Sequence, residues 1–188
     1  MAARRACWHE QLAADPVAAL VFVDESGAHT KMTRLRGRAL GGQRLRARIP
    51  HGHYQTSTLI AGLRLGGPCA PWLFGGAMNG EMFLAWVRQG LAPTLRPGDI
   101  VILDNLATHK IRGVRDALAA VGARLLYLPP YSPDFNPIEP MWSKIKQTLR
   151  RHAPRTEEEL LQAAKTAFNS ISSADCKGFF FSARYATS

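Results

Sequence analysis

Three acidic residues stand where a folded chain could bring them to one place. Asp24 follows the apolar run 18–23, and Asp104 follows the apolar run 101–103. Both runs are typical of strands buried on both faces, and in open α/β sheets the functional crevice lies at the carboxyl ends of such strands. The third acid, Glu139, opens a predicted helix after a proline-rich loop. The segment between the last two acids has room for one helix and one strand, enough to return the chain to the same edge.

Clustered carboxylates predict a hard divalent cation. Two of them about 4 Å apart repel by roughly 4 kcal/mol at an effective dielectric of 20, and a divalent ion reverses that sign. Magnesium prefers oxygen ligands and keeps several waters, so a few carboxylates suffice. Two such ions about 3.5–4 Å apart can hold the attacking and leaving oxygens of a phosphodiester in line. The acids therefore favour metal-dependent phosphodiester chemistry.

Each acid also has a purely structural interpretation. Asp24 could be a turn residue, Asp104 could cap the helix that follows it, and Glu139 could favour a helix N-terminus electrostatically. Two other acids compete with them: Glu25 should point to the opposite face of its strand from its neighbour, and Asp134 sits in a proline-flanked turn. Spacing alone leaves both interpretations open.

The helix predicted over 138–151 gives the third acid a defined position. Its buried stripe repeats at i, i+4, i+7 and i+11 and consists of Ile138, Trp142, Ile145 and Leu149. A polar stripe with the same spacing, one step round the helix, consists of Glu139, Ser143, Lys146 and Arg150. The acid is therefore expected at the edge of the core, beside two cations that attract phosphate.

Composition and charge narrow the function classes. The chain has 188 residues, 46% hydrophobic and 20% charged, which fits one globular domain and excludes a disordered or fibrous protein. The formal net charge of +10 makes a polyanion such as nucleic acid the first partner to consider. The three cysteines are scattered, so the sequence predicts neither a disulfide framework nor a zinc site. This cysteine usage indicates a reducing compartment. No apolar run near the start is long enough to span a membrane.

Two arginine ladders interrupt the chain after the first predicted strand. Arginines alternate with other residues over 34–38 and again over 44–48, with two glycines between. In a hairpin the arginines of each ladder would lie on one face of their strand, and Leu45, Ala47 and Ile49 would face the core. The ladders could track phosphates along a duplex, or they could form an ordinary solvated sheet face.

The order of elements predicts a mixed sheet covered by helices. Antiparallel strands come first, and alternating strands and helices follow. Strands are expected at 18–23, 54–65, 69–74, 99–103 and 124–128, with a turn at 25–27. Helices are expected at 80–91, 111–121 and 138–151, and a last one begins at the capping box of Thr156 and Glu159.

The sequences around the three acids resemble one family. The segments VDESG at 23–27, LDN at 103–105 with His109 and Lys110, and LPPYSPDFNPIE at 128–139 are similar to the catalytic domain of mariner-related bacterial insertion-sequence transposases. Those enzymes belong to the DDE superfamily, within the retroviral integrase superfamily. The resemblance covers roughly 20–149. It implies an α/β, ribonuclease H-like fold, with a five-stranded mixed sheet flanked by helices.

The same resemblance implies an activity and its residues. Asp24, Asp104 and Glu139 would bind two Mg²⁺ ions, with Mn²⁺ able to substitute. The reaction would be cleavage at transposon ends, followed by attack of the freed 3′-hydroxyl on target DNA. Supporting roles would fall to Asn105, His109 and Asn136, although loop-stabilising hydrogen bonds explain these residues equally well. The expected DNA contacts are Arg44, Arg46, Arg48, Lys110, Lys146 and Arg150.

The resemblance also sets expectations for domains and partners. Residues 1–17 would be a short leader or remnant linker, 18–152 the catalytic domain, and 153–188 a helical extension packed on it. The partners would be transposon-end and target DNA, a second copy of the chain, and a separately encoded helix-turn-helix region, in the bacterial cytoplasm at the nucleoid and without a membrane. Two alternatives remain: a ribonuclease H-like nuclease without strand transfer, and an inactive DNA-binding remnant.

Overall fold

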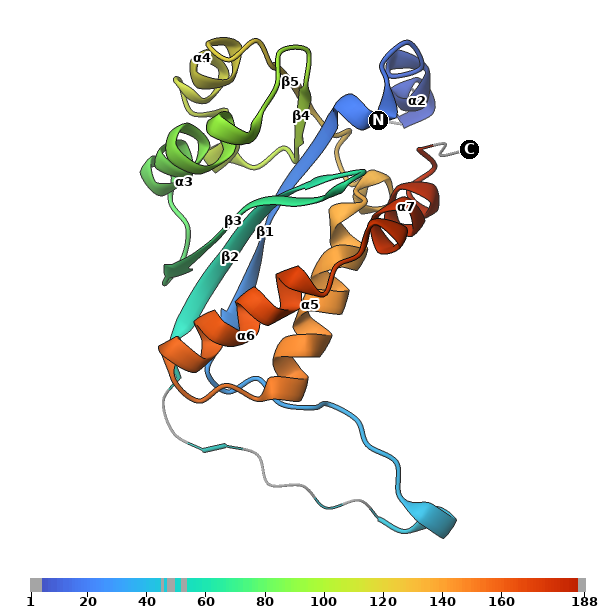
Figure 1. The fold of residues 1–188 in the computed structure, drawn as a ribbon, viewed down its shortest axis with the longest axis vertical. Coiled ribbons are helices and arrows are strands. Elements are labelled where there is room, and N and C mark those ends of the chain that lie inside the picture. The colour runs from blue at the N-terminus through green and yellow to red at the C-terminus, as the bar shows by residue number, and fades with distance from the viewer. Residues whose placement is uncertain (1–4, 45, 47–49, 52–53, 186–188) are drawn as a thin grey trace.

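A five-stranded mixed sheet forms the centre of the computed structural model, which describes residues 5–44, 46, 50–51 and 54–185 (Figure 1). The strand order is β3-β2-β1-β4-β5. The strands are β1 (Leu20–His29), β2 (Thr56–Arg64), β3 (Gly67–Gly75), β4 (Ile100–Leu103) and β5 (Arg124–Tyr127). This sheet, flanked by helices, confirms the predicted fold class.

The register of the two central strands sets up the candidate site. β1 pairs antiparallel with β2 but parallel with β4, and β4 pairs parallel with β5. The carboxyl ends of β1, β4 and β5 therefore share one direction. Phe22 lies opposite Ile102, and continuing this register by two residues aligns Asp24 with Asp104.

β1 is longer than predicted, so the turn expected at 25–27 is wrong. The strand continues to His29, which lies opposite Thr56 of β2. Antiparallel pairing with β2 satisfies the backbone groups of these residues, and Gly27 is accommodated within the strand. As a consequence Asp24 and Glu25 are strand residues, and their side chains point to opposite faces of the sheet.

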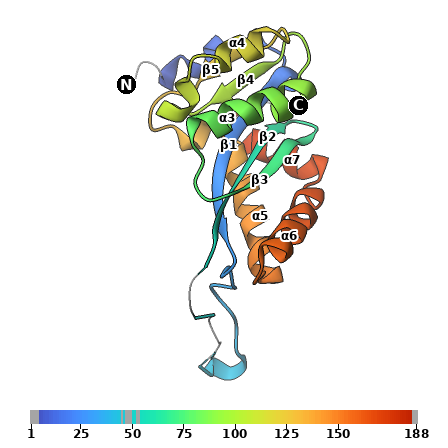
Figure 2. The ribbon, with the colours of Figure 1, turned by 90° about the vertical axis from the view of Figure 1, so that its left-hand side faces the viewer.

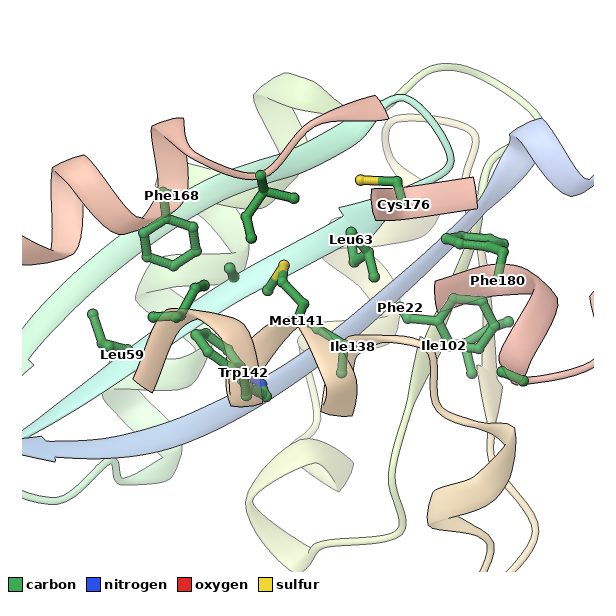
Figure 3. Packing of buried hydrophobic residues seen from close by; sticks show 14 of the residues in the cluster. Phe22, Leu59, Leu63, Ile102, Ile138, Met141, Trp142, Phe168, Cys176 and Phe180 are labelled. Carbon is green, nitrogen blue, oxygen red and sulfur yellow. The ribbon is translucent and has the colours of Figure 1, made fainter. Parts of the chain in front are cut away.

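Three helices cover one face of the sheet (Figures 1 and 2). They are α5 (Ile138–His152), α6 (Glu157–Asn169) and α7 (Ser173–Ser182), the last of which the sequence pattern did not predict. Figure 3 shows their apolar side chains packed against Phe22, Leu59 and Ile102 of the strands. The predicted buried stripe of α5 is buried throughout, and the capping box that begins α6 is present. The apolar period of α5 therefore fixes which way Glu139 faces.

The opposite face carries α3 (Gly80–Trp86), the π-helical turn η3 (Val87–Leu91) and α4 (Val114–Ala119). The α-helical parts are shorter than the ranges predicted, because the first of these helices changes to a π-turn and the second is a single short helix. A further short helix, α2 (Trp8–Gln11), lies near the N-terminus. The remaining turns are η1 (Val17–Ala19), η2 (Leu40–Gly42), η4 (Ala92–Thr94), η5 (Ala107–Lys110) and η6 (Pro133–Phe135). In the described part of the chain, no helix is long and apolar enough to cross a membrane.

Residues 30–44, called the arm below, extend from the end of β1 well beyond the sheet (Figures 1 and 2). The predicted arginine hairpin is wrong over the described residues, since neither 34–38 nor Arg44 and Arg46 lie in a strand. An isolated two-stranded ribbon is marginal in water, and although Met32 at the base of the arm is buried in the core, residues 34–44 are all exposed. Arg48 and the three apolar residues expected to face the core lie outside the described residues.

Candidate active site

All three predicted acids line one cavity of about 480 Å³. Asp24 comes from β1, Asp104 directly follows β4, and Glu139 lies in the first turn of α5. The rest of the lining comes from 105–106 and from the proline-rich loop over 128–136. The competing acids Glu25 and Asp134 are not part of this lining. The parallel strand ends and the buried stripe of α5 thus bring together acids that are far apart in sequence.

Asp24 is the acid most affected by its surroundings. Burial and the negative charge of Glu139, with smaller contributions from the charges of Glu25 and Asp104, together raise its pKa to about 7. A like charge raises the pKa of a carboxyl only when it is near. The three carboxylates therefore form one repelling electrostatic group, of the kind that a bound cation stabilises.

Asp104 has one oxygen tied to its own turn. Its Oδ1 accepts a 3.0 Å hydrogen bond from the backbone N–H of Leu106, and Nδ1 of His109 lies 2.6 Å from the same oxygen in a poorly aligned ion pair. Burial acts to raise the pKa of this carboxyl, but these two contacts outweigh it and hold the pKa below the ordinary value. Asp104 therefore stays ionised at neutral pH.

His109 connects Asp104 to β1 from behind the cavity. Its side chain is fully buried, and its Nε2 lies 2.8 Å and 3.1 Å from the two carboxylate oxygens of Glu25. Burial disfavours the charged ring, but the contacts with Asp104 and Glu25 outweigh it and raise the pKa to about 9. The imidazole is therefore held between two carboxylates as a cation at neutral pH.

Glu139 and the two asparagines belong to the loop side of the cavity. The backbone N–H of Glu139 donates to the Asn136 carbonyl, and the Asn105 amide donates to the Leu128 carbonyl. Asn136 is 6% exposed, and within the described residues its Oδ1 has no hydrogen-bond partner. A buried acceptor without a donor is costly unless a ligand completes it. Both asparagines line the cavity, and their supporting roles stay a prediction.

The residue types around the cavity fit a hard divalent cation. Three carboxylates and a buried, unpartnered amide oxygen are the donors that Mg²⁺ and Mn²⁺ prefer. In the part of the chain that the structure describes, no three Asp, Glu, His or Cys side chains are already arranged as a metal site. The cavity thus supplies suitable oxygen donors that are not preassembled around an ion.

Both ends of the described chain hold the loop that forms the cavity wall. Arg5 donates to the Tyr131 carbonyl and to Ser132, and pairs with Asp134 at 2.7 Å. This pairing gives Asp134, a competitor at the sequence level, a structural role. Behind the loop, the Trp8 indole N–H donates to the Tyr185 hydroxyl, which donates to the Phe135 carbonyl.

The predicted DNA-contacting residues are spread over the molecule. Lys110 lies near the cavity, where its charge helps to lower the pKa of Asp104. Lys146 and Arg150 follow Glu139 along α5, whereas Arg44 and Arg46 are exposed beyond the sheet.

A separate groove, called the basic groove below, lies between the arm and the C-terminal end of α5. Its lining is Arg34, Leu35, Arg36, Gln147, Arg150 and Arg151.

Two features of this site were not predicted from the sequence. Glu25 was treated only as a competitor of Asp24, but it is the partner of His109. The one available signal was strand alternation, which places it on the face of β1 opposite Asp24. Arg151 was not among the expected DNA contacts, and its place in one groove with Arg34 and Arg36 of the first ladder was not predicted. They come together only through the path of the arm.

The sequence that forms this site also matches a known protein family. The model of the family described as DDE superfamily endonuclease matches residues 19–161, the segment that contains all three acids. The chain belongs to the DDE superfamily of endonucleases. Among curated proteins, none matches this sequence.

Solved structures with a similar fold are those of Mos1 mariner transposase. A pre-cleavage Mos1 transpososome superposes with a TM-score of 0.77 at 15% identity, and a Mos1 paired-end complex with Mn with a TM-score of 0.74 at 17% identity. The Mos1 catalytic domain alone gives 0.65 at 16% identity. Each match covers 96% of this chain, but 57% of the two complexed Mos1 chains and 85% of the catalytic domain. This DDE endonuclease thus spans little more than half the length of the complexed chains.

Proposed function

We propose that this DDE endonuclease is the catalytic part of a DNA transposase. It would cleave DNA at transposon ends and transfer the resulting 3′-hydroxyl into target DNA. The observation that carries the proposal is the shared cavity of Asp24, Asp104 and Glu139, formed by the element ends that the fold brings together. These three residues would hold two Mg²⁺ ions, or Mn²⁺ in their place. The Mos1 structures solved with Mn and with Mg support a divalent ion in this fold.

The chain's own groups have separate tasks in this chemistry. Paired divalent ions, when bound, activate the attacking oxygen and stabilise the leaving one. Asp104 presents an ionised carboxylate, and Asp24 loses its proton when a cation neutralises its surroundings. Asn136 offers a buried acceptor on the loop side, and Lys110 adds a positive charge that can contact a phosphate. Water remains accessible through the open side of the cavity, where Glu139 is exposed.

DNA as the substrate is supported by charge beyond the cavity. The chain carries a net charge of +10, and Lys146 and Arg150 extend from Glu139 along α5 toward the basic groove. Arginine side chains attract phosphate oxygens and often bind them bidentately. We assign the basic groove to the duplex that flanks the cleavage site, with Arg44, Arg46 and Arg48 as further contacts.

The assembly belongs to the same proposal. The Mos1 matches include a paired-end complex and a strand-transfer complex, and this chain covers 56–57% of those chains. We propose a homodimer on paired ends, with a helix-turn-helix region outside this chain reading the transposon end. Such an enzyme would act in the cytoplasm, at the nucleoid if its host is bacterial. The division into a leader (1–17), a catalytic domain (18–152) and a helical extension (153–188) stays a prediction.

A nicking assay tests the cavity directly. Supercoiled plasmid incubated with the protein should be nicked in Mg²⁺ or Mn²⁺ and not in excess chelator. Asp24→Asn, Asp104→Asn and Glu139→Gln should each lower the rate at least about 100-fold, because ligated metal contributes several kcal/mol to the transition state. Asp116→Asn and Glu158→Gln, at exposed sites on other helices, are the matched controls. Nicking that survives all three cavity substitutions would contradict the proposal.

Two alternatives differ in their products. A nuclease without strand transfer would nick plasmid but would not join a pre-cut duplex with a free 3′-hydroxyl to a target plasmid. An inactive DNA-binding remnant would bind duplex and show neither reaction. The joined product, observed with the wild-type chain and lost in Asp104→Asn, distinguishes the transposase from both.

A further inference from the structure

Behind the cavity, a buried histidine connects β1, which carries Asp24, to Asp104, which follows β4. His109 is fully buried and lies in η5, the turn that follows β4. Its neighbour on the other side is Glu25, which directly follows Asp24 on β1. Because alternate strand residues face opposite ways, Asp24 lines the cavity while Glu25 reaches the histidine on the far face. His109 itself does not line the cavity.

The contacts of Asp104 are unequal between its two oxygens. Both contacts described above, from the Leu106 N–H and from Nδ1 of His109, fall on Oδ1. No described residue donates to Oδ2, although Asp104 lines the cavity and its side chain is 35% exposed. One oxygen is therefore fixed by the protein, and the other is available to a ligand in the cavity.

His109 is itself held in place through both its ring and its backbone. Both oxygens of Glu25 lie within 3.1 Å of Nε2, and the Phe83 ring packs against the imidazole at 4.4 Å between centroids. The Tyr127 hydroxyl of β5 donates to the His109 carbonyl, and the His109 N–H donates to the Leu106 carbonyl. A ring fixed in this way can transmit the position of β1 to the carboxylate that follows β4.

We propose that Glu25 and His109 form a positioning pair that holds Asp104 by Oδ1 and leaves Oδ2 directed to the divalent ion. The inference rests on the function proposed above, since it assigns Asp104 to the metal. Carboxylates that bind metal ions are commonly held by hydrogen-bond partners that do not touch the ion, and loss of such a partner typically weakens metal binding about 10–100-fold. Here the bridge runs from a non-ligand acid to a ligand acid, and it couples the two strands.

Two substitutions of the same histidine separate its two contacts. The amide nitrogen of Asn can occupy the place of Nδ1, so His109→Asn retains a donor to Asp104 and no longer reaches Glu25. The amide nitrogen of Gln can occupy the place of Nε2, so His109→Gln retains the contact with Glu25 and no longer holds Asp104. Glu25→Gln weakens the pair from the other end. His29→Gln, at the far end of β1, and the exposed Glu81→Gln are matched controls.

The measurement is Mn²⁺ affinity, followed by electron paramagnetic resonance of the free ion, with the full chain bound to a DNA duplex. We expect His109→Gln to weaken Mn²⁺ binding about 10–100-fold, and His109→Asn and Glu25→Gln to weaken it less. The controls should bind Mn²⁺ as the wild type does. DNA affinity without metal should be the same in all variants, and thermal midpoints should not follow the order of the Mn²⁺ affinities.

The possible results of the Mn²⁺ measurement distinguish the positioning role of His109 from the metal site itself. Wild-type Mn²⁺ affinity in His109→Gln would overturn the positioning role, as would equal losses in the two histidine variants that follow their thermal midpoints. Failure of the wild type to bind Mn²⁺, or unchanged binding in Asp104→Asn, would instead overturn the proposed metal site itself. Weakened binding in the order Gln before Asn, with folding and DNA affinity intact, would support the pair.

Discussion

Without a bound cation, the ionised carboxylate of Asp24 lowers the stability of the folded protein. Its ordinary pKa is 3.8, and burial beside Glu139 raises it to about 7 in the fold. The folded state therefore binds a proton more tightly than the unfolded state, so stability is lost as the pH rises from about 4 to 7. A tenfold difference in proton affinity corresponds to about 1.36 kcal/mol, so the loss amounts to a few kcal/mol.

This predicts how the metal-free protein responds to pH. In excess chelator, the thermal midpoint of the wild type should fall between pH 5 and pH 6.5, below the range in which the raised pKa of His109 changes the stability, and Asp24→Asn should remove most of that fall, because the amide carries no charge. Thermal unfolding followed by circular dichroism at both pH values measures the effect, with Asp116→Asn as the control that keeps the wild-type slope. An unchanged pH dependence in Asp24→Asn would show that this carboxyl is not destabilised by its surroundings.

Individual residues differ in how far the sequence could predict them. That the three acids lie together could be predicted, because two of them follow buried apolar runs, the third opens a helix, and all three stand in family-like motifs. The partnership of Glu25 with His109 could not, because it depends on how η5 packs across β1. Asn136 was expected to support the site, but its unpaired Oδ1 depends on the path of the proline-rich loop.

Among the elements, a single ion pair ties the end of β2 to the start of β4. Arg64 donates to both oxygens of Asp99 at 3.0 Å and 2.7 Å, and Asp99 is 4% exposed. Burial acts to raise the pKa of Asp99, but Arg64 and the Arg96 N–H outweigh it and lower the pKa. The pair therefore stabilises the fold above the ordinary pKa of Asp, and this contribution is lost as the pH falls through the lowered value.

Breaking this pair from one side should destabilise the sheet strongly. Arg64→Met leaves a buried carboxylate without its partner, and such losses amount to about 3–5 kcal/mol. The double variant Arg64→Met with Asp99→Leu should recover a large part of that loss, because no buried charge remains. Urea denaturation at pH 7 measures both variants. Equal stability of the single and the double variant would mean that Asp99 is solvated without Arg64.

The elements that the sequence predicted well are those with a repeated buried face. The period of α5 and the apolar run before Asp24 reflect burial against the same core, so the sequence pattern and the packing agree. The arginine ladders have a strand-like period, but residues 34–44 are exposed, and over the described residues no strand forms. The extension of β1 past Asp24 depends on pairing with β2, which local sequence does not encode.

Across the whole molecule, the two ends of the described chain converge on the cavity wall. The Tyr185 hydroxyl accepts from Trp8 at 2.7 Å and donates to the Phe135 carbonyl at 2.8 Å, and all three groups are buried.

Tyr185→Phe leaves a buried N–H and a buried carbonyl unpaired, which should cost about 1–3 kcal/mol. Chemical denaturation gives the stability, and limited proteolysis shows whether the loop over 128–136 is cut faster. Phe181→Leu, exposed on α7, is the control; an undiminished stability in Tyr185→Phe would mean that water replaces the hydroxyl.

The position of the basic groove predicts where flanking duplex would lie. Along α5, Arg150 is about 17 Å from Glu139 at 1.5 Å per residue, which corresponds to about five base pairs at 3.4 Å each. The four groove arginines have no ion-pair partner among the described residues, so their charges are available to phosphates. Duplex that extends beyond five base pairs from the cleavage centre should therefore bind more tightly and with a steeper salt dependence.

Removing two groove charges should flatten that salt dependence without affecting the chemistry. Arg150→Gln with Arg151→Gln should lower the slope of log affinity against log salt by about 0.9 for each phosphate that the protein no longer neutralises. Arg112→Gln with Arg115→Gln, exposed on the opposite face of the sheet, removes the same charge and should leave the slope unchanged. A duplex too short to reach the groove should bind both double variants equally. A groove variant that retains the wild-type slope on long duplex would place the DNA elsewhere, and Arg44, Arg46 and Arg48 would then be the next residues to replace.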